Sequence, residues 1–307
     1  ALLFLPHLHW QAAAGWPTLE FMANAAAQRM ARVPPLVFLA RQLFYFNPAA
    51  AVLSIAGFWF LLADSCGRRY RVIGLALLIV FCFLMAGQKS KVTYLVPAYT
   101  MLFAAGAVAL AQRFERRGRC WLPAVLLLAV VGVGAALAPL RLPILSIEGF
   151  RSYQRLLGVP PASEENLKLG TLPQRYADMF GWRELTAAVA RAAATLPPRE
   201  RAAAPVFTFN YGEAAALDFF GREAGAPRAI SGHNSYWRWG PGPFSGEVLL
   251  AIGGEREEWQ QQFEEVAQVG ATRCADCMPY ENGRPIFVLR HLRRPLRQAW
   301  LEWKHYD

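Results

Sequence analysis

Long apolar stretches dominate the first half of the chain. A helix needs roughly 20 residues to cross a hydrocarbon core about 30 Å thick. The pattern therefore predicts four membrane spans, at residues 40–63, 72–86, 93–112 and 121–142. The second run is short, but its flanks can supply another turn. Residues 1–5 continue an apolar run without the marks of a signal peptide, so we expect them to be the end of an earlier span in a longer protein.

The second half alternates two other patterns. Amphipathic periodicity predicts helices at residues 182–196, 212–223 and 256–267, and short apolar runs predict strands at 205–209, 247–252 and 285–292. Strands that alternate with helices indicate a small layered α/β domain, Rossmann-like in outline. We therefore expect a polytopic helical membrane region over residues 1–145, a polar linker over 146–177 and a soluble α/β domain over 178–307.

Composition and charge agree with this division. Hydrophobic residues make up 55% of the 307 residues, which is too apolar for an ordinary soluble protein. The net charge of +10 lies in residues 1–145, where 13 Lys and Arg face 3 acidic residues, whereas residues 146–307 hold 19 of each sign. Basic residues between apolar runs are typical of membrane proteins. A neutral second half has no general attraction for a polyanion, so no nucleic acid partner is expected.

The basic loops also predict an orientation. The loops at residues 68–71 and 113–119 belong on the cytoplasmic side by the positive-inside rule. Residues 6–39, the 87–92 loop and everything after residue 143 then lie outside. A composition rich in Ala and Arg suggests a GC-rich bacterium, so we expect a multi-pass protein of the bacterial inner membrane with a periplasmic C-terminal domain.

The segment over residues 87–97 is the strongest candidate for chemistry. Lys89, Lys91 and Tyr94 could donate hydrogen bonds to the phosphate of a polyprenyl carrier. Pro97 would break or kink the following helix and free backbone groups that line a cavity. The alternative is that both lysines snorkel to lipid head groups at a helix end.

Several local motifs together resemble a known family. The chain resembles the integral-membrane glycosyltransferases of the GT-C superfamily, in the branch of dolichyl-phosphate-mannose mannosyltransferases and aminoarabinose transferases. The matching motifs are His9-Trp10 with Gly15-Trp16-Pro17-Thr18-Leu19-Glu20-Phe21, Gln42-Leu43 with Asn47-Pro48, Lys89-Ser90-Lys91 with Tyr94 and Pro97, Phe180-Gly181-Trp182, Asn234-Ser235-Tyr236 with Trp239-Gly240-Pro241, and Cys277-Met278-Pro279-Tyr280-Glu281.

The resemblance implies a hexosyl- or pentosyltransferase. Such an enzyme moves a sugar from a polyprenyl-phosphate carrier to a lipid, glycan or protein acceptor at the outer face of the membrane. The catalytic carboxylates of such proteins lie in their first outer loop, which this sequence does not contain, so Lys89, Lys91 and Tyr94 are its expected lipid-phosphate ligands. No cofactor is expected in this part, and a divalent metal in the full-length protein stays open. The alternative function is a non-catalytic, membrane-anchored ligand-binding or assembly protein.

A second group of residues could shape a sugar or acceptor site. His9, Trp10 and Glu20 lie in a segment that equally suits a helix at the membrane interface. Trp237 and Trp239 lie in an aromatic loop rich in Gly and Pro. Exposed aromatic faces pack on sugar rings, but such a loop could also be a rigid turn held at the membrane surface.

The Cys274-Ala275-Asp276-Cys277 sequence is the remaining motif. On an oxidising outer side it could form a disulfide, and two plain thiols or a redox-active pair are the alternatives. A zinc site needs more ligands than the nearby His291 and His305 offer, so no metal site is predicted.

Overall fold

The computed structural model describes residues 2–44, 47–89, 91–163 and 165–307 and contains two compact units. One unit, here called the apolar-helix unit, covers Met30–Pro160. The other, called the α/β unit, joins Ala1–Arg29 to Pro161–Asp307. The expected ranges put the N-terminal residues with the membrane region, whereas the structure groups them with the C-terminal sheet. The chain is mostly helical and adds one small sheet.

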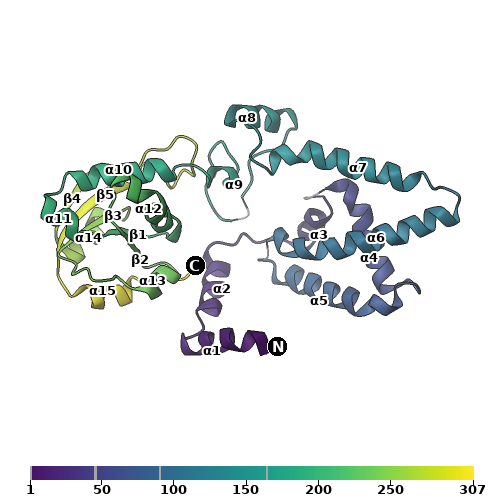
Figure 1. Cartoon of the computed structure of the whole chain (residues 1–307), viewed down its shortest axis with the longest axis horizontal. Helices are drawn as coiled ribbons and strands as arrows, with labels where there is room; N and C mark the ends of the chain where they lie inside the picture. Colours follow the sequence, from purple (N-terminus) through teal and green to yellow (C-terminus); the bar gives the residue numbers. More distant parts are fainter. Residues whose placement is uncertain (1, 45–46, 90, 164) are drawn as a thin grey trace. The chain divides into compact units, whose positions relative to one another are not determined.

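The apolar-helix unit consists of six α-helices in the described residues. Three stretches are long and apolar enough to cross a membrane, namely Arg68–Gly87, Val92–Arg116 and Leu122–Leu140. They match three of the four predicted spans, and they suggest a membrane protein. The α-helices of the unit are α3 (Pro35–Phe44), α4 (Ala51–Leu62), α5 (Arg71–Gly87), α6 (Val96–Arg116), α7 (Leu122–Leu137) and α8 (Ile147–Leu156), as drawn in Figure 1.

The first predicted span, residues 40–63, falls on a bent pair of helices that together are long and apolar enough to cross a membrane. The structure has two helical stretches there, Pro35–Leu43 and Pro48–Leu62, bent by 98° at the break. Asn47 explains where the second stretch begins, because its side chain accepts hydrogen bonds from the backbone N–H groups of Ala49 and Ala50. A polar N-cap followed by proline starts a helix afresh. Residues 45 and 46 lie outside the described part of the chain.

Helices α4 and α6 pack with their backbones in close approach. A Cβ atom on Gly57 would collide with the carbonyl group of Leu102, and one on Gly106 would collide with the carbonyl group of Leu53. Small residues at a helix crossing allow this approach, which is common between membrane helices. The α4–α6 pair is therefore the framework of the apolar-helix unit.

The α/β unit is built on a five-stranded sheet. Its strand order is β2-β1-β3-β5-β4. Strands β1 (Val206–Thr208), β2 (Ala229–Ser231) and β3 (Val248–Ile252) are parallel, whereas β5 (Pro285–Leu292) runs antiparallel to both β3 and β4 (Phe263–Ala271). The helices of this unit are α1 (Leu5–Ala13), α2 (Pro17–Gln28), α9 (Gln174–Ala177), α10 (Trp182–Ala194), α11 (Pro198–Ala203), α12 (Tyr211–Ala224), α13 (Ser235–Trp239), α14 (Arg256–Gln262) and α15 (Leu296–Glu302).

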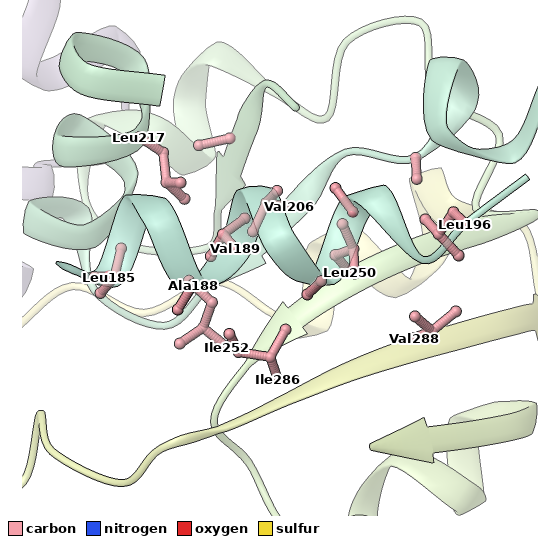
Figure 2. Close-up of a cluster of buried hydrophobic side chains, with 14 of the residues drawn as sticks. Leu185, Ala188, Val189, Leu196, Val206, Leu217, Leu250, Ile252, Ile286 and Val288 are labelled. Carbon is pink, nitrogen blue, oxygen red and sulfur yellow. The ribbon is translucent and has the colours of Figure 1, made fainter. Parts of the chain in front are cut away.

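Alternation along the strands creates two cores, one on each face of the sheet. Leu250 and Ile252 of β3 point into the core covered by α10 and α12, which Figure 2 shows together with Val189 and Leu217. Leu249 lies in the opposite core, with Trp259 of α14 and Trp300 of α15 among its members. Burial of each such leucine contributes about 2 kcal/mol. The layered α/β arrangement predicted from the sequence is thus present.

Local predictions in both units are corrected. The predicted helix 256–267 ends at Gln262, because Phe263 begins the edge strand β4 and pairs with Leu292 of β5. Strand β2, only three residues long, was not predicted. The segment expected to be a linker, residues 146–177, contains α8, which Ser146 caps by accepting from the Gly149 N–H, and the short helix α9.

Candidate functional site

An apolar cavity of about 380 Å³ lies inside the apolar-helix unit. Helices α3, α4, α5 and α6 line this half-open cavity, and almost all of its lining side chains are hydrocarbon or aromatic. The lining residues are Leu39, Gln42, Leu43, Ser54, Ile55, Phe58, Leu62, Leu77, Leu78, Phe81, Leu95, Ala98, Tyr99 and Leu102. A cavity of this size and chemistry fits a segment of a hydrocarbon chain.

Two polar side chains tie the 88–95 segment to the wall of this cavity. Buried Gln42 donates from Nε2 to the Val92 carbonyl oxygen at 3.1 Å. The Tyr99 hydroxyl donates to the Gln42 backbone oxygen at 3.0 Å and also contacts Gln42 Oε1. Leu95, three residues after Val92, itself lines the cavity. The segment predicted to bind phosphate therefore continues directly into the cavity wall.

The other end of the segment is fixed as well. Gln88 adopts a left-handed conformation with φ of 53°, and its carbonyl oxygen accepts from the Val33 N–H at 2.7 Å. Lys89 is exposed, Lys91 is half-buried, and Tyr94 is exposed in the short 3-10 helix Val92–Leu95. Ser90 of the same motif lies outside the described residues. Figure 1 shows α5 leading into this segment and α6 leading out of it.

Pro97 has a different role from the one predicted. It occupies the first turn of α6 rather than the interior of a helix. A proline there leaves no hydrogen bond unmade, since the first N–H groups of a helix have no intrahelical partner. Pro97 therefore lies at the start of α6. The prediction that it kinks a helix and frees backbone groups is wrong.

Arg32 is a third cation at this end of the unit, and it was not predicted. Its Nε atom donates to Gln88 Oε1 at 2.8 Å, although the two residues are far apart in the sequence. We call Arg32, Lys89 and Lys91 the cationic rim. Basic side chains beside an apolar cavity suit a ligand with an anionic head and a hydrocarbon tail.

Several of the predicted sugar-site residues meet in the α/β unit. Lys304 Nζ lies 2.7 Å from Glu20 Oε2, 5.1 Å from the centre of the Trp237 ring and 4.9 Å from that of Tyr306. The Arg238 guanidinium lies 5.1 Å from the centre of the Trp10 ring. Cation–π contacts and an ion pair thus join α1 and α2 to α13 and the last residues. Arg238, Lys304 and Tyr306 were not among the predicted site residues, because only the tertiary fold brings them to Trp10, Glu20 and Trp237.

The remaining members of the predicted sugar site are arranged differently. Trp237 is fixed by its indole N–H, which donates to the Trp300 carbonyl oxygen at 2.9 Å, while the Trp300 indole returns the same bond to Trp237. Trp239, by contrast, is 69% exposed, and His9 is exposed on α1. Trp237 is therefore a structural residue of α13, and Trp239 is the aromatic face open to a ligand or to lipid.

His233, His305 and Asp307 form a group with the spacing of metal ligands. The ring nitrogens are already engaged, however. His233 Nδ1 accepts from the Tyr211 N–H at 3.2 Å, which places its proton on Nε2, 3.0 Å from the Asp307 backbone oxygen. His305 Nε2 lies 2.6 Å from the Phe209 carbonyl oxygen. Burial lowers the pKa of His233. A metal ion would have to replace these bonds, so the arrangement is better explained as a polar network of the fold.

Cys274 and Cys277 are free thiols in the structure, so the disulfide stays a prediction. They lie in the loop between β4 and β5, next to the start of α10, where a Cβ atom on Gly181 would lie 3.1 Å from Cys274 Sγ. The other three cysteines, Cys66, Cys82 and Cys120, are exposed in the apolar-helix unit.

Comparison of the chain with protein families, with curated proteins and with solved structures gave no match.

Proposed function

We propose that this chain is part of a membrane glycosyltransferase of the GT-C type that takes a sugar from a polyprenyl-phosphate carrier. The observation that supports the proposal is that Gln42, in the wall of an apolar cavity between four helices, binds the Val92 carbonyl oxygen, one residue after Lys91, while Arg32 binds Gln88, one residue before Lys89. A polyprenyl phosphate has an anionic head, which the cationic rim would bind, joined to a hydrocarbon chain, which the cavity would hold. The acceptor would be a lipid, a glycan or a protein at the outer face of the membrane.

In this proposal the residues of the chain act on the donor. The cavity holds the first isoprene units, and the cationic rim holds the phosphate. When the bond between the sugar and the phosphate breaks, negative charge grows on the phosphate oxygens. Ammonium and guanidinium groups placed at those oxygens stabilise the charge more in the transition state than in the ground state. The Tyr94 hydroxyl could donate a further hydrogen bond at the same place.

The proposal includes an orientation and a location. The cationic rim and the α/β unit would lie on the periplasmic side of a bacterial inner membrane. The arginines at 68–71 and 113–119, at the opposite ends of α5 and α6 from the 88–95 segment, would lie in the cytoplasm. Labelling of Trp239→Cys by a membrane-impermeant thiol reagent in intact cells should succeed, in a background in which the five natural cysteines are replaced.

Binding of polyprenyl phosphate to the full chain in nanodiscs tests the phosphate role. A hydrogen bond to a charged group contributes about 1.5–3 kcal/mol, so Lys89→Ala combined with Lys91→Ala should weaken binding about 100-fold or more. Polyprenol, which lacks the phosphate, should bind the variant and the parent equally. Arg68→Ala combined with Arg69→Ala removes two cations from the other end of α5 and is the matched control. Equal affinity of the lysine variant and this control would exclude the cationic rim.

Transfer itself is tested with membranes that contain the complete protein. The Lys89→Ala, Lys91→Ala variant should lose transfer of a radiolabelled sugar from its polyprenyl-phosphate carrier, and the arginine control should keep it. Carrier binding without any transfer by the parent protein would instead favour a non-catalytic carrier-binding protein.

A further inference from the structure

The loop that carries Cys274 and Cys277 is held in a fixed shape. Thr272 closes its base, since its N–H donates to the Arg284 carbonyl oxygen at 2.8 Å and its hydroxyl donates to the Glu281 carbonyl oxygen at 2.7 Å. The Cys274 N–H donates to Asn282 Oδ1 at 2.9 Å. Each of these bonds joins the first residues of the loop, after β4, to its last residues, before β5. The two cysteines therefore occupy a preformed turn rather than a loose segment.

The two sulfur atoms lie within this one turn. The Cys277 N–H points at Cys274 Sγ, with nitrogen and sulfur 3.1 Å apart. Cys277 Sγ lies 3.5 Å from the Cys274 carbonyl oxygen. Each sulfur thus contacts a backbone atom of the other cysteine. Both sulfur atoms therefore lie on one turn, where rotation of the side chains could bring them together for a disulfide.

The environments of the two thiols are unequal. Cys277 is 8% exposed. Burial, followed by the hydrogen bond and the charge of Cys274, raises the pKa of Cys277 to about 12. Cys274 is partly exposed, accepts the Cys277 N–H, and lies against Gly181, the N-cap of the thirteen-residue helix α10. Cys274 is thus the thiol that another molecule can reach.

We propose that Cys274 and Cys277 are a thiol–disulfide exchange pair, in which Cys274 attacks and Cys277 resolves. The Cys274 thiolate attacks a disulfide of a protein or small-molecule partner, forms a mixed disulfide with one sulfur and releases the other as a thiolate. Cys277 then loses its proton to solvent and attacks Cys274 Sγ, which releases the second partner thiolate. The partner disulfide gains two electrons, and the Cys274–Cys277 pair loses two. The reverse sequence reduces the pair.

A metal site is the main competing explanation for a Cys-x-x-Cys sequence. Two thiolates need further ligands to complete a zinc site. Within the described ranges, the one group of three or more side chains with metal-ligand spacing is His233, His305 and Asp307, and it includes neither cysteine. The exchange proposal does not depend on the glycosyltransferase proposal, since the pair lies in the α/β unit and the cationic rim in the other.

The test uses the full chain with Cys66, Cys82 and Cys120 replaced by alanine, to which Cys277→Ser or Cys274→Ser is added. Each protein is incubated with glutathione disulfide and analysed by mass spectrometry of the quenched protein. The Cys277→Ser protein should accumulate one stable glutathione adduct at Cys274. The Cys274→Ser protein should react at least about tenfold more slowly, because its remaining thiol is buried.

The protein with both cysteines gives a readout that does not require a substitution in the pair. It should lose two hydrogen atoms without keeping an adduct, and a dithiol reductant should restore the original mass. Equal adduct formation in the two single variants, both shown to be folded by circular dichroism, would overturn the order of attack. Failure of the intact pair to form the internal disulfide would overturn the proposal itself.

Discussion

The two units of the chain use the same kinds of side chain in opposite ways. In the α/β unit, Leu249 and Leu250 of β3 are fully buried between helices. In the apolar-helix unit, Phe83 of α5 is 75% exposed and Leu128 of α7 is 70% exposed. Large apolar side chains facing outward over whole helices are stable in lipid and costly in water. The comparison shows that burial, more than composition, indicates the solvent for which each unit is built.

The units also differ in how their elements are joined. Side chains from both faces of a sheet fill the two cores of the α/β unit, so its stability depends on large residues. The α4–α6 pair depends on the absence of side chains at Gly57 and Gly106. Replacing a large apolar core side chain should therefore destabilise the α/β unit, whereas adding one at the α4–α6 crossing should destabilise the apolar-helix unit.

The largest expected effect is that of a charge in the sheet. Leu250→Asp places an unpaired carboxylate between β3 and α10 and should destabilise the α/β unit by more than about 4 kcal/mol. Leu128→Asn, at an outward-facing position of α7, should leave that unit unchanged. Limited proteolysis of residues 161–307 in the full chain measures both variants. If the Leu250 variant resisted protease as well as the parent, the sheet would not be the core described here.

The second prediction concerns the α4–α6 crossing. Gly106→Leu drives a side chain into the backbone of α4, and overpacking of this kind costs about 1–3 kcal/mol or more. Gly132→Leu is the matched control, because a Cβ atom on Gly132 of α7 would meet no atom within 4 Å. Thermal unfolding in detergent should show a lower midpoint for the Gly106 variant alone. Equal midpoints would contradict the close approach.

The smallest effect is a pH dependence confined to the α/β unit. Burial, with a contribution from Asp178, raises the pKa of Glu281 from its ordinary value of 4.5 to about 7. The folded state then binds more protons than the unfolded state between these values, so this group stabilises below about pH 4.5 and loses that contribution as pH rises through about 7. Glu281→Gln should reduce the change of the thermal unfolding midpoint with pH across this range. An unchanged slope would show that Glu281 is ordinarily acidic.

Much of the fold could be predicted because its signals are local. The three long apolar helices and strands β1, β3 and β5 each contain a run of apolar residues. Strand β4 was assigned to a helix because its burial is confined to a few positions at the sheet edge, and its Glu264 and Glu265 are exposed. The apolar runs on both sides of Asn47-Pro48 were predicted as one span, and Asn47 caps the second helix by accepting from the Ala49 and Ala50 N–H groups. For strand β4 the pairing with β5 decided the outcome, and no single window of sequence contains that contact.

The candidate site was predictable in part for the same reason. Lys89, Lys91 and Tyr94 stand together in the sequence, and their charge opposes the usual bias of membrane loops. Arg32 joins them only because Gln88 folds back to it. Likewise, Glu20 and Trp237 are far apart in the sequence, and in the structure the Lys304 ammonium group contacts both of them.

Photo-crosslinking with a farnesyl phosphate that carries a diazirine on its chain tests the central claim most directly. In nanodiscs containing the full chain, adducts should concentrate on the cavity residues Phe58, Leu78 and Tyr99, and excess polyprenyl phosphate should compete while polyprenol should not. Adducts spread equally over outward-facing residues such as Phe83 and Leu128, with no effect of the phosphate, would contradict a carrier site in the apolar-helix unit.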